Sequence, residues 1–222
     1  MTSHTMRIIT PLPLLLACQV CFAGEDTNII AMSDWSKPVA TQSGSHVQKL
    51  RARMLVMYGR GACFDGPNPE TQFYLELSNI SCANVPMQIC FDPLHQLSCA
   101  LLDVNGKPVP TPRPGAGSIP ERSGDWITLP YDSTIRLRVN SGGYGNKKGE
   151  GLNLYLWPSG SWYLRPGDTN TYYLIGTFTV TNHVATGMNQ PGGFRPRETE
   201  LFDAEWSGTI ELPKMKISVP KP

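Results

Sequence analysis

Two histidines, His95 and His183, stand where a catalytic base would be sought first. Imidazole changes its charge near neutral pH, and a hydrolase would combine it with a nucleophile and an orienting carboxylate. No GxSxG, HExxH or SxxK motif occurs in the chain. His95 follows Asp92-Pro93 in a predicted turn and His183 begins a long polar segment. Both are interpreted as solvated loop residues, and the protein is expected not to be an enzyme.

Carboxylates offer two further chemistries, the acid pair of a glycosidase and the oxygen ligands of a calcium loop. Several aspartates stand next to Gly or Pro, where Asp favours turns. The segments DVNGK at 103–107 and PGDTN at 166–170 share parts of a calcium loop but lack its alternating ligand series. A secreted carboxylate-based hydrolase is therefore the weakest functional hypothesis, and no metal or cofactor is expected.

Aromatic residues could supply a surface that stacks on sugars or grips a peptide. Trp162 and Trp206 share faces with aliphatic residues, which predicts core positions. Trp157 and Tyr155 alternate with leucines, so that one pair could face outward, although burial is the favoured reading. Asn79-Ile80-Ser81 also matches an N-glycosylation sequon, which matters only in a eukaryotic host.

The first 23 residues have the pattern of a secretory signal peptide. Arg7 precedes an apolar run from 8 to 17, and small residues follow it. The run is shorter than the ~20 residues that a membrane-spanning helix needs. Cleavage after Ala23 is favoured, and the alternative is a lipoprotein-like box that leaves a lipid anchor on Cys18. We expect an exported protein, periplasmic or extracellular, without a transmembrane segment.

Charge argues against a nucleic-acid partner. The chain has 19 basic and 18 acidic residues, and removal of the signal with its single Arg7 leaves 19 − 1 = 18 of each. A net charge of zero gives no general basic field to attract a polyanion such as DNA or RNA.

The positioning elements are predicted to be short β-strands. The chain contains 21 Gly and 20 Pro, which interrupt it at short intervals between runs of alternating polarity. This rhythm predicts an all-β fold with about seven to nine antiparallel strands and long Gly/Pro-rich loops. Residues 24–46 carry little pattern and are expected to form an extended N-terminal arm, followed by one β-sandwich domain over 47–222.

Strand periodicity assigns side chains to faces. In 50–58 the even-numbered residues are apolar, and in 134–139 the odd-numbered residues are. Arginines alternate with them and are expected to point away from the core: Arg51, Arg53, Arg136 and Arg138. Glu76 is expected to lie outside as well, because Phe73, Leu75 and Leu77 form the apolar series of its strand.

The segment 164–180 is the most structured in the sequence. Pro166-Gly167 fits a type II turn, and both faces of the run that follows are partly apolar. This predicts a central strand in which Gly176 allows a close approach by a neighbour. Two long polar segments, 107–125 and 181–203, are expected to be surface loops.

Four cysteines lie between residues 63 and 99, and their spacing is too wide for a zinc site. In an exported protein such a cluster suggests disulfides. If successive strands reverse direction, Cys63, Cys90 and Cys99 lie near one end of the sheet and Cys82 near the other. We expect one bond among the first three, with Cys63–Cys99 slightly preferred because it closes the longest loop. Cys82 is expected to be a free, partly shielded thiol.

Several runs together resemble exported bacterial immunoglobulin-like β-sandwich proteins. They are FYLELSNISCANVPMQICFDP, LLDVNGKPV, WITLPYDSTIRLRV, WYLRPGDTNTYYLIGTFTV and WSGTIELPKMKI. The resemblance covers roughly residues 48–219 and implies the fold without implying an activity. The leading hypothesis is a non-catalytic extracytoplasmic binding or structural module that contacts a protein or glycan through the loops 107–125 and 181–203. The alternative is a secreted proteinase inhibitor.

Overall fold

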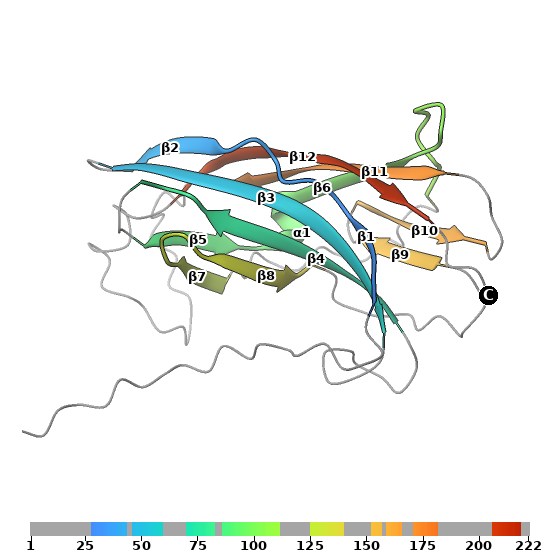
Figure 1. The fold of residues 1–222 in the computed structure, drawn as a ribbon. Helices are drawn as coiled ribbons and strands as arrows, with labels where there is room; N and C mark the ends of the chain where they lie inside the picture. The colour runs from blue at the N-terminus through green and yellow to red at the C-terminus, as the bar shows by residue number, and fades with distance from the viewer. Residues whose placement is uncertain are drawn as a thin grey trace, which may run out of the picture.

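Antiparallel β-strands make up most of the residues that the structure describes, which confirms the predicted all-β class (Figure 1). The computed structural model describes residues 28–43, 46–59, 70–82, 86–111, 125–139, 152–156, 159–165, 171–181 and 206–218. These residues contain twelve strands, more than the seven to nine expected.

Four sheets are formed by these strands. The five-stranded sheet has β3 (His46–Gly59), β4 (Glu70–Asn79) and β8 (Thr134–Arg138) in that order, with β1 (Asn28–Met32) and β2 (Val39–Ser43) both on the other edge of β3. The three-stranded sheet has the order β12 (Gly208–Ile217), β11 (Tyr172–Val180), β6 (Leu97–Leu102). The two-stranded sheets pair β5 (Met87–Phe91) with β7 (Asp125–Leu129) and β9 (Leu152–Leu156) with β10 (Gly160–Leu164).

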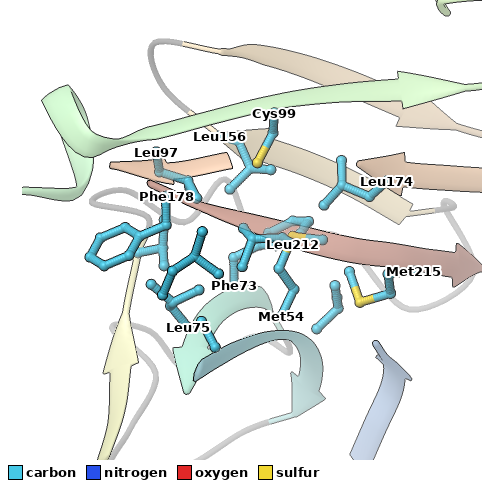
Figure 2. Close-up of a cluster of buried hydrophobic side chains, with 14 of the residues drawn as sticks. Met54, Phe73, Leu75, Leu97, Cys99, Leu156, Leu174, Phe178, Leu212 and Met215 are labelled. Atoms are coloured by element: carbon cyan, nitrogen blue, oxygen red, sulfur yellow. The ribbon is translucent and has the colours of Figure 1, made fainter. Parts of the chain in front are cut away.

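The core lies between the five-stranded and the three-stranded sheets. Met54, Phe73 and Leu75 point from the former toward Leu174 and Phe178 of the latter, as Figure 2 shows. The alternation predicted for 50–58 holds from 50 to 54, where the even-numbered apolar residues are buried and the arginines are not. From 55 to 57 it is lost, because Leu55 and Met57 are buried as well as Val56. Both sheets thus bury one face through period-two patterning, but the outward side of the five-stranded sheet is partly buried too, at Leu55, Met57, Gln72, Glu76 and Ser78.

The N-terminal stretch is not a separate arm but part of the five-stranded sheet. β1 pairs with the second half of β3 and β2 pairs with its first half, so that together they line one edge of the long strand. The stretch lacks a hydrophobic alternation because main-chain bonds and the hydroxyls of Ser33 and Ser36 join it to β3. That is why the sequence pattern alone did not reveal them.

The expected reversal of direction between β5 and β6 is wrong. β5 starts opposite Leu129, whose carbonyl accepts from the Asn79 side chain. Asn79 is paired with Leu50 in the first half of β3, so β5 starts at the same end of the molecule as β3. β11 ends beside the start of β12, and there Thr41 of β2 donates to the Ser207 carbonyl, which places this point at the same end of the molecule. Because β6 is antiparallel to β11, β6 starts at this end as well. β5 and β6 therefore run the same way, and the chain passes from one sheet to another between them (Figure 1).

One helical turn, α1 (Pro93–Gln96), makes this passage possible. The Gln96 side chain accepts from the Asp92 backbone N–H at 2.7 Å and donates to the Cys90 carbonyl at 2.6 Å. His95 Nδ1 lies 2.7 Å from Asp92 Oδ2 across the same turn. These contacts stabilise a turn after which the chain continues in the same direction in another sheet. The sequence around Pro93 had indicated only that a strand ends there.

The central-strand prediction for 172–180 is confirmed, since β11 lies between β6 and β12. A Cβ placed on Gly176 would lie 2.8 Å from the Ser98 carbonyl oxygen and 2.9 Å from Cys99 Sγ, so the expected close approach is also confirmed. The register of β11 and β12 shifts between Leu174 and Gly176, opposite Pro213. Pro213 thus sits at a bulge in a strand that has one partner among the described residues, as its missing N–H requires.

Candidate functional site

The outward face of the five-stranded sheet carries a concentration of arginines. Alternation along β3 and β8 places Arg51, Arg53, Arg136 and Arg138 on this side, opposite the buried core residues of the same strands. We call these four residues and the overlying Trp35 the arginine face. The outward direction of all four arginines was predicted from the sequence, but their assembly into one surface was not.

One buried carboxylate organises the middle of the arginine face. Arg53, Glu76 and Arg136 are directly paired across three adjacent strands. Arg53 Nε donates to Glu76 Oε2 at 2.6 Å, whereas Arg136 donates from Nε and Nη2 to Oε1 at 2.9 and 2.8 Å. Glu76 is only 4% exposed, so water screens these contacts weakly. Both oxygens of the carboxylate are engaged, and neither is left for a third guanidinium.

Trp35 covers two of the arginines. The Cζ atoms of Arg51 and Arg53 each lie 4.5 Å from the centroid of the Trp35 ring. A guanidinium at this distance is attracted by the ring quadrupole, typically by about 0.5–1 kcal/mol at exposed sites. Stacking also limits the rotamers of two long side chains, which reduces the entropy that either would lose when it binds a ligand.

Two serines place Trp35 over the sheet. Between β1 and β2, the Ser33 and Ser36 N–H groups donate to the carbonyls of Met54 and Ala52 at 3.0 and 2.8 Å. Their hydroxyls accept in return from the N–H groups of Met54 and Ala52, both at 3.0 Å. The two serines therefore complete the main-chain hydrogen bonds of Ala52 and Met54 in β3, while the two residues between the serines loop out of the sheet. Trp35 belongs to that looped-out pair, which projects it over Arg51 and Arg53.

Arg51 has a donor that lacks an acceptor. Its Nε is buried and has no hydrogen-bond partner, and among the described residues Arg51 makes no ion pair. A buried guanidinium N–H without an acceptor costs on the order of 1–3 kcal/mol. Arg51 lies in the same cross-strand row as Thr134, which is exposed. An acceptor that approaches from this end of the face would meet a guanidinium already held in place.

Basic side chains outnumber acidic ones among the described residues of the arginine face. Four guanidiniums lie there with the Glu76 carboxylate, which pairs with two of them, while Asp34 stands next to Trp35 in the overlying segment and Arg138 has an interaction of its own. Planar guanidinium groups match the geometry of carboxylates, sulfates and phosphates, which they bind through paired N–H donors. The chemistry that this arrangement supports is recognition of an anion.

The predicted catalytic candidates do not gather at this face. His95 contacts Asp92 within the α1 turn, so it supports the strand passage and is not simply a solvated loop residue. His183 lies outside the described residues. In the part of the chain that the structure covers, no three His, Cys, Asp or Glu side chains come together as metal ligands. Asp103 accepts instead from the N–H groups of Asn105 and Lys107, both at 2.8 Å, in a turn.

The disulfide candidates are only partly covered by the structure. No bond joins Cys82, Cys90 and Cys99 to one another, and Cys63 lies outside the described residues. Cys99 is a free thiol on the core-facing side of β6, where Leu97 and Leu101 are also buried, and burial raises its pKa to about 12. Cys82 is also free, and it is exposed rather than partly shielded.

Two further surface candidates have different outcomes. Asn79 of the sequon is fully buried, and its side-chain amide donates to the Leu129 carbonyl at 3.0 Å, so it is structural. Trp162 and Trp206 are buried as predicted, whereas Tyr163 of β10 is exposed. The candidate loops 107–125 and 181–203 and the residue Trp157 lie mostly or wholly outside the described residues.

Sequence reasoning missed Trp35 and the pairing of Arg53 and Arg136 through Glu76. The motif Ser33-Asp34-Trp35-Ser36 is the signal that could have found the tryptophan, because two serines that flank a looped-out pair can complete a strand ladder. Searches against protein-family models, curated proteins and solved structures find no match to this chain. No described helix has the length and apolar character needed to cross a bilayer.

Proposed function

We propose that this chain is a non-catalytic extracytoplasmic binding module that recognises a carboxylate-bearing protein or glycan through the arginine face. The observation that carries the proposal is the Arg51 guanidinium, which is stacked on Trp35 while its buried Nε has no acceptor. A carboxylate bound beside Arg51 would pair with this preorganised guanidinium and offset its positive charge.

The proposed affinity comes from preorganisation rather than from a large interface. Arg53 is fixed by Glu76 and by Trp35, and Arg51 is aligned beside it on the same ring. Two neighbouring guanidiniums in fixed positions lose little side-chain entropy when an anion arrives. A hydrogen bond to a charged group typically contributes about 1.5–3 kcal/mol, so each carboxylate contact would be a substantial part of a micromolar interaction.

The proposed architecture is an immunoglobulin-like β-sandwich within the all-β class. Support comes from the face-to-face contact of the two larger antiparallel sheets and from the passage of β5 through α1 into β6. An experimental structure in which these sheets do not enclose a common core would refute this assignment.

Export remains part of the proposal and rests on the signal-like pattern of residues 1–23, which the structure does not describe. The mature N-terminus is expected at Gly24. Intact-mass measurement of the processed protein decides between this and a lipid-modified Cys18, which would instead support the lipoprotein alternative.

Binding to poly-L-glutamate and to polygalacturonate tests the proposed function, with neutral dextran as the negative control. Arg51→Gln should weaken the binding of an acidic polymer about tenfold, or about 1.4 kcal/mol, because the stacked donor is lost. Lys216→Gln is the matched control, since it removes one positive charge from an exposed position on β12 of the other sheet. If the two substitutions weaken binding equally, net charge alone explains the interaction and the proposal is wrong.

A further inference from the structure

A bulge in β1 places two apolar side chains on the outward side of the five-stranded sheet. Ile29 pairs with Met57 and Met32 pairs with Leu55, and the register shifts between Ile29 and Ala31. Without this shift, residues 29 and 32 would lie on opposite faces, because side chains alternate along a strand. The extra residue of the bulge brings both to the face that Leu55 and Met57 share with the arginines.

These side chains form an apolar surface, which we call the β1 patch: Ile29 and Met32 of β1 with Leu55 and Met57 next to them on β3. Ile29 and Met32 are 50% and 48% exposed, whereas Leu55 and Met57 are buried. Single exposed apolar residues are common on protein surfaces, but here a bulge aims two of them at the same side. A binding partner could remove from water the apolar area that folding leaves exposed.

The β1 patch adjoins the arginine face. Arg136 Nη1 lies 3.7 Å from the sulfur of Met57, and Met57 is the direct cross-strand partner of Ile29. Met32 immediately precedes the looped segment that carries Trp35 over two of the arginines. Apolar side chains and guanidinium groups therefore lie side by side on one face of the sheet.

We propose that the β1 patch binds large apolar side chains of a partner protein whose acidic residues pair with the arginine face. This inference rests on the proposed function and narrows its partner to a protein. An acidic glycan has no aliphatic side chains to bury against Ile29 and Met32. A protein segment can place Leu, Ile or Phe beside Asp or Glu and so match both parts of this surface.

The shape and charge of this face disfavour two other occupants. A surface that binds membranes buries its apolar side chains about 5–10 Å into the lipid, whereas Ile29 and Met32 belong to a sheet strand and are only half exposed. A second copy of this chain would bring its own arginines against those of the first, and like-charge repulsion opposes such a contact. An acidic protein segment meets neither obstacle.

Two octapeptides of equal charge test the inference by fluorescence anisotropy with the full mature chain. One has Leu at positions 3 and 6 of an otherwise all-Glu peptide, and the other has Ser there. The leucine peptide should bind about tenfold more tightly, which corresponds to about 1.4 kcal/mol and to partial burial of its leucines. Replacing both Ile29 and Met32 by Ser should reduce this ratio to about one. Val104→Ser, at an exposed apolar position in another turn, should keep the ratio.

Methionine methyl NMR tests the contact in the unaltered chain, so the result does not depend on how a variant folds. The Met32 signal, assigned from its absence in Met32→Leu, should shift when the leucine peptide binds. It should shift much less when the serine peptide reaches the same occupancy. Met215, which is fully buried in the core, should keep its signal. A Met32 signal that does not move at saturation with the leucine peptide would overturn the inference.

The outcomes distinguish this inference from the proposed function. Equal binding of the two peptides, with Arg51→Gln still weakening both, would overturn the role of the β1 patch and leave anion recognition in place. The inference is also wrong if the double substitution abolishes binding to phosphatidylglycerol vesicles but leaves the peptide ratio unchanged, since the patch would then contact lipid. Loss of the Arg51 effect on poly-L-glutamate and polygalacturonate would remove the proposed function itself.

Discussion

Replacement of Asn79 by Ala should destabilise the fold far more than a polar substitution normally does. The side chain of Asn79 is fully buried where β4 ends. Its Nδ2 donates to the Leu129 carbonyl of β7 at 3.0 Å, and its Oδ1 accepts from Ser81 N and Oγ at 3.1 and 2.6 Å. The Ser81 hydroxyl also accepts from the Lys49 N–H at 2.9 Å. One amide thus joins the five-stranded sheet to the β5–β7 pair.

The magnitude follows from the hydrogen bonds that the substitution removes. Asn79→Ala removes three hydrogen bonds and leaves the buried Ser81 N–H without an acceptor, whereas the Leu129 carbonyl still has its ladder partner Met87. A buried polar group that loses its partner costs about 1–3 kcal/mol, so the expected loss is about 2–4 kcal/mol after partial relaxation. For a chain of this size, 1 kcal/mol corresponds to about 2–4 °C, and the midpoint should fall by roughly 5–15 °C.

Thermal unfolding followed by circular dichroism measures this shift, and Asn105→Ala is the matched control. Asn105 is exposed in a turn, and the bond made there comes from its backbone N–H to Asp103, so its substitution should change stability by less than about 0.5 kcal/mol. If the two variants melt within about 2 °C of each other, the reasoning about Asn79 is refuted, because such a gap is no larger than an ordinary surface substitution produces. The same burial predicts that the sequon stays unglycosylated in a folded chain made in a eukaryotic host.

Three other positions, Gly176, Cys99 and Cys82, make independent predictions. Gly176→Ala should cost about 1–3 kcal/mol in a urea titration, and adding Cys99→Ala should restore only part of it, because the Ser98 carbonyl is backbone and stays in place; an unchanged midpoint would count against the packing described. Burial raises the pKa of Cys99 from 9.0 to about 12, so the thiol of the unfolded chain ionises at a lower pH than that of the folded protein. Above pH 9.0 the wild type should therefore lose stability relative to Cys99→Ala, by at most about 1.4 kcal/mol per pH unit. Parallel profiles of stability against pH for the two proteins would contradict this. Iodoacetamide should modify Cys82 in the folded protein and Cys99 only after unfolding without reductant, whereas a Cys99 that requires reduction would reveal a disulfide.

Side-chain periodicity was predictable wherever a strand buries one face. The alternation of Arg51 and Arg53 with apolar neighbours correctly gave the outward side of β3, and the mixed faces around Gly176 correctly gave a central strand. Both follow because hydrophobic burial constrains residue type at every second position. The turn at Gly106, which has a positive φ of 79°, was predictable because Asn-Gly favours that conformation.

Features that depend on the backbone or on distant partners were not predictable in this way. β1 and β2 join β3 through main-chain bonds and through the hydroxyls of Ser33 and Ser36, which impose no hydrophobic pattern. The direction of β6 depends on one helical turn held by Gln96, which is too short to have a periodicity of its own. The candidate site was unpredictable for the same reason, because it depends on a contact between distant segments. Alternation gave the outward direction of each arginine side chain, but no local pattern indicated that Trp35 stacks on two of them.

The state of the Arg51 Nε–H group tests the central claim most directly. An NMR spectrum that detects arginine Nε–H pairs can follow this group while poly-L-glutamate is added, with the signal assigned from its absence in Arg51→Lys. We predict that the Arg51 signal shifts in proportion to occupancy, because a carboxylate that pairs with the Arg51 guanidinium changes the environment of its buried Nε. The signal of Arg165, which is exposed and follows β10, should stay unchanged. An Arg51 signal that does not move at saturation, or that moves no more than that of Arg165, would contradict the account.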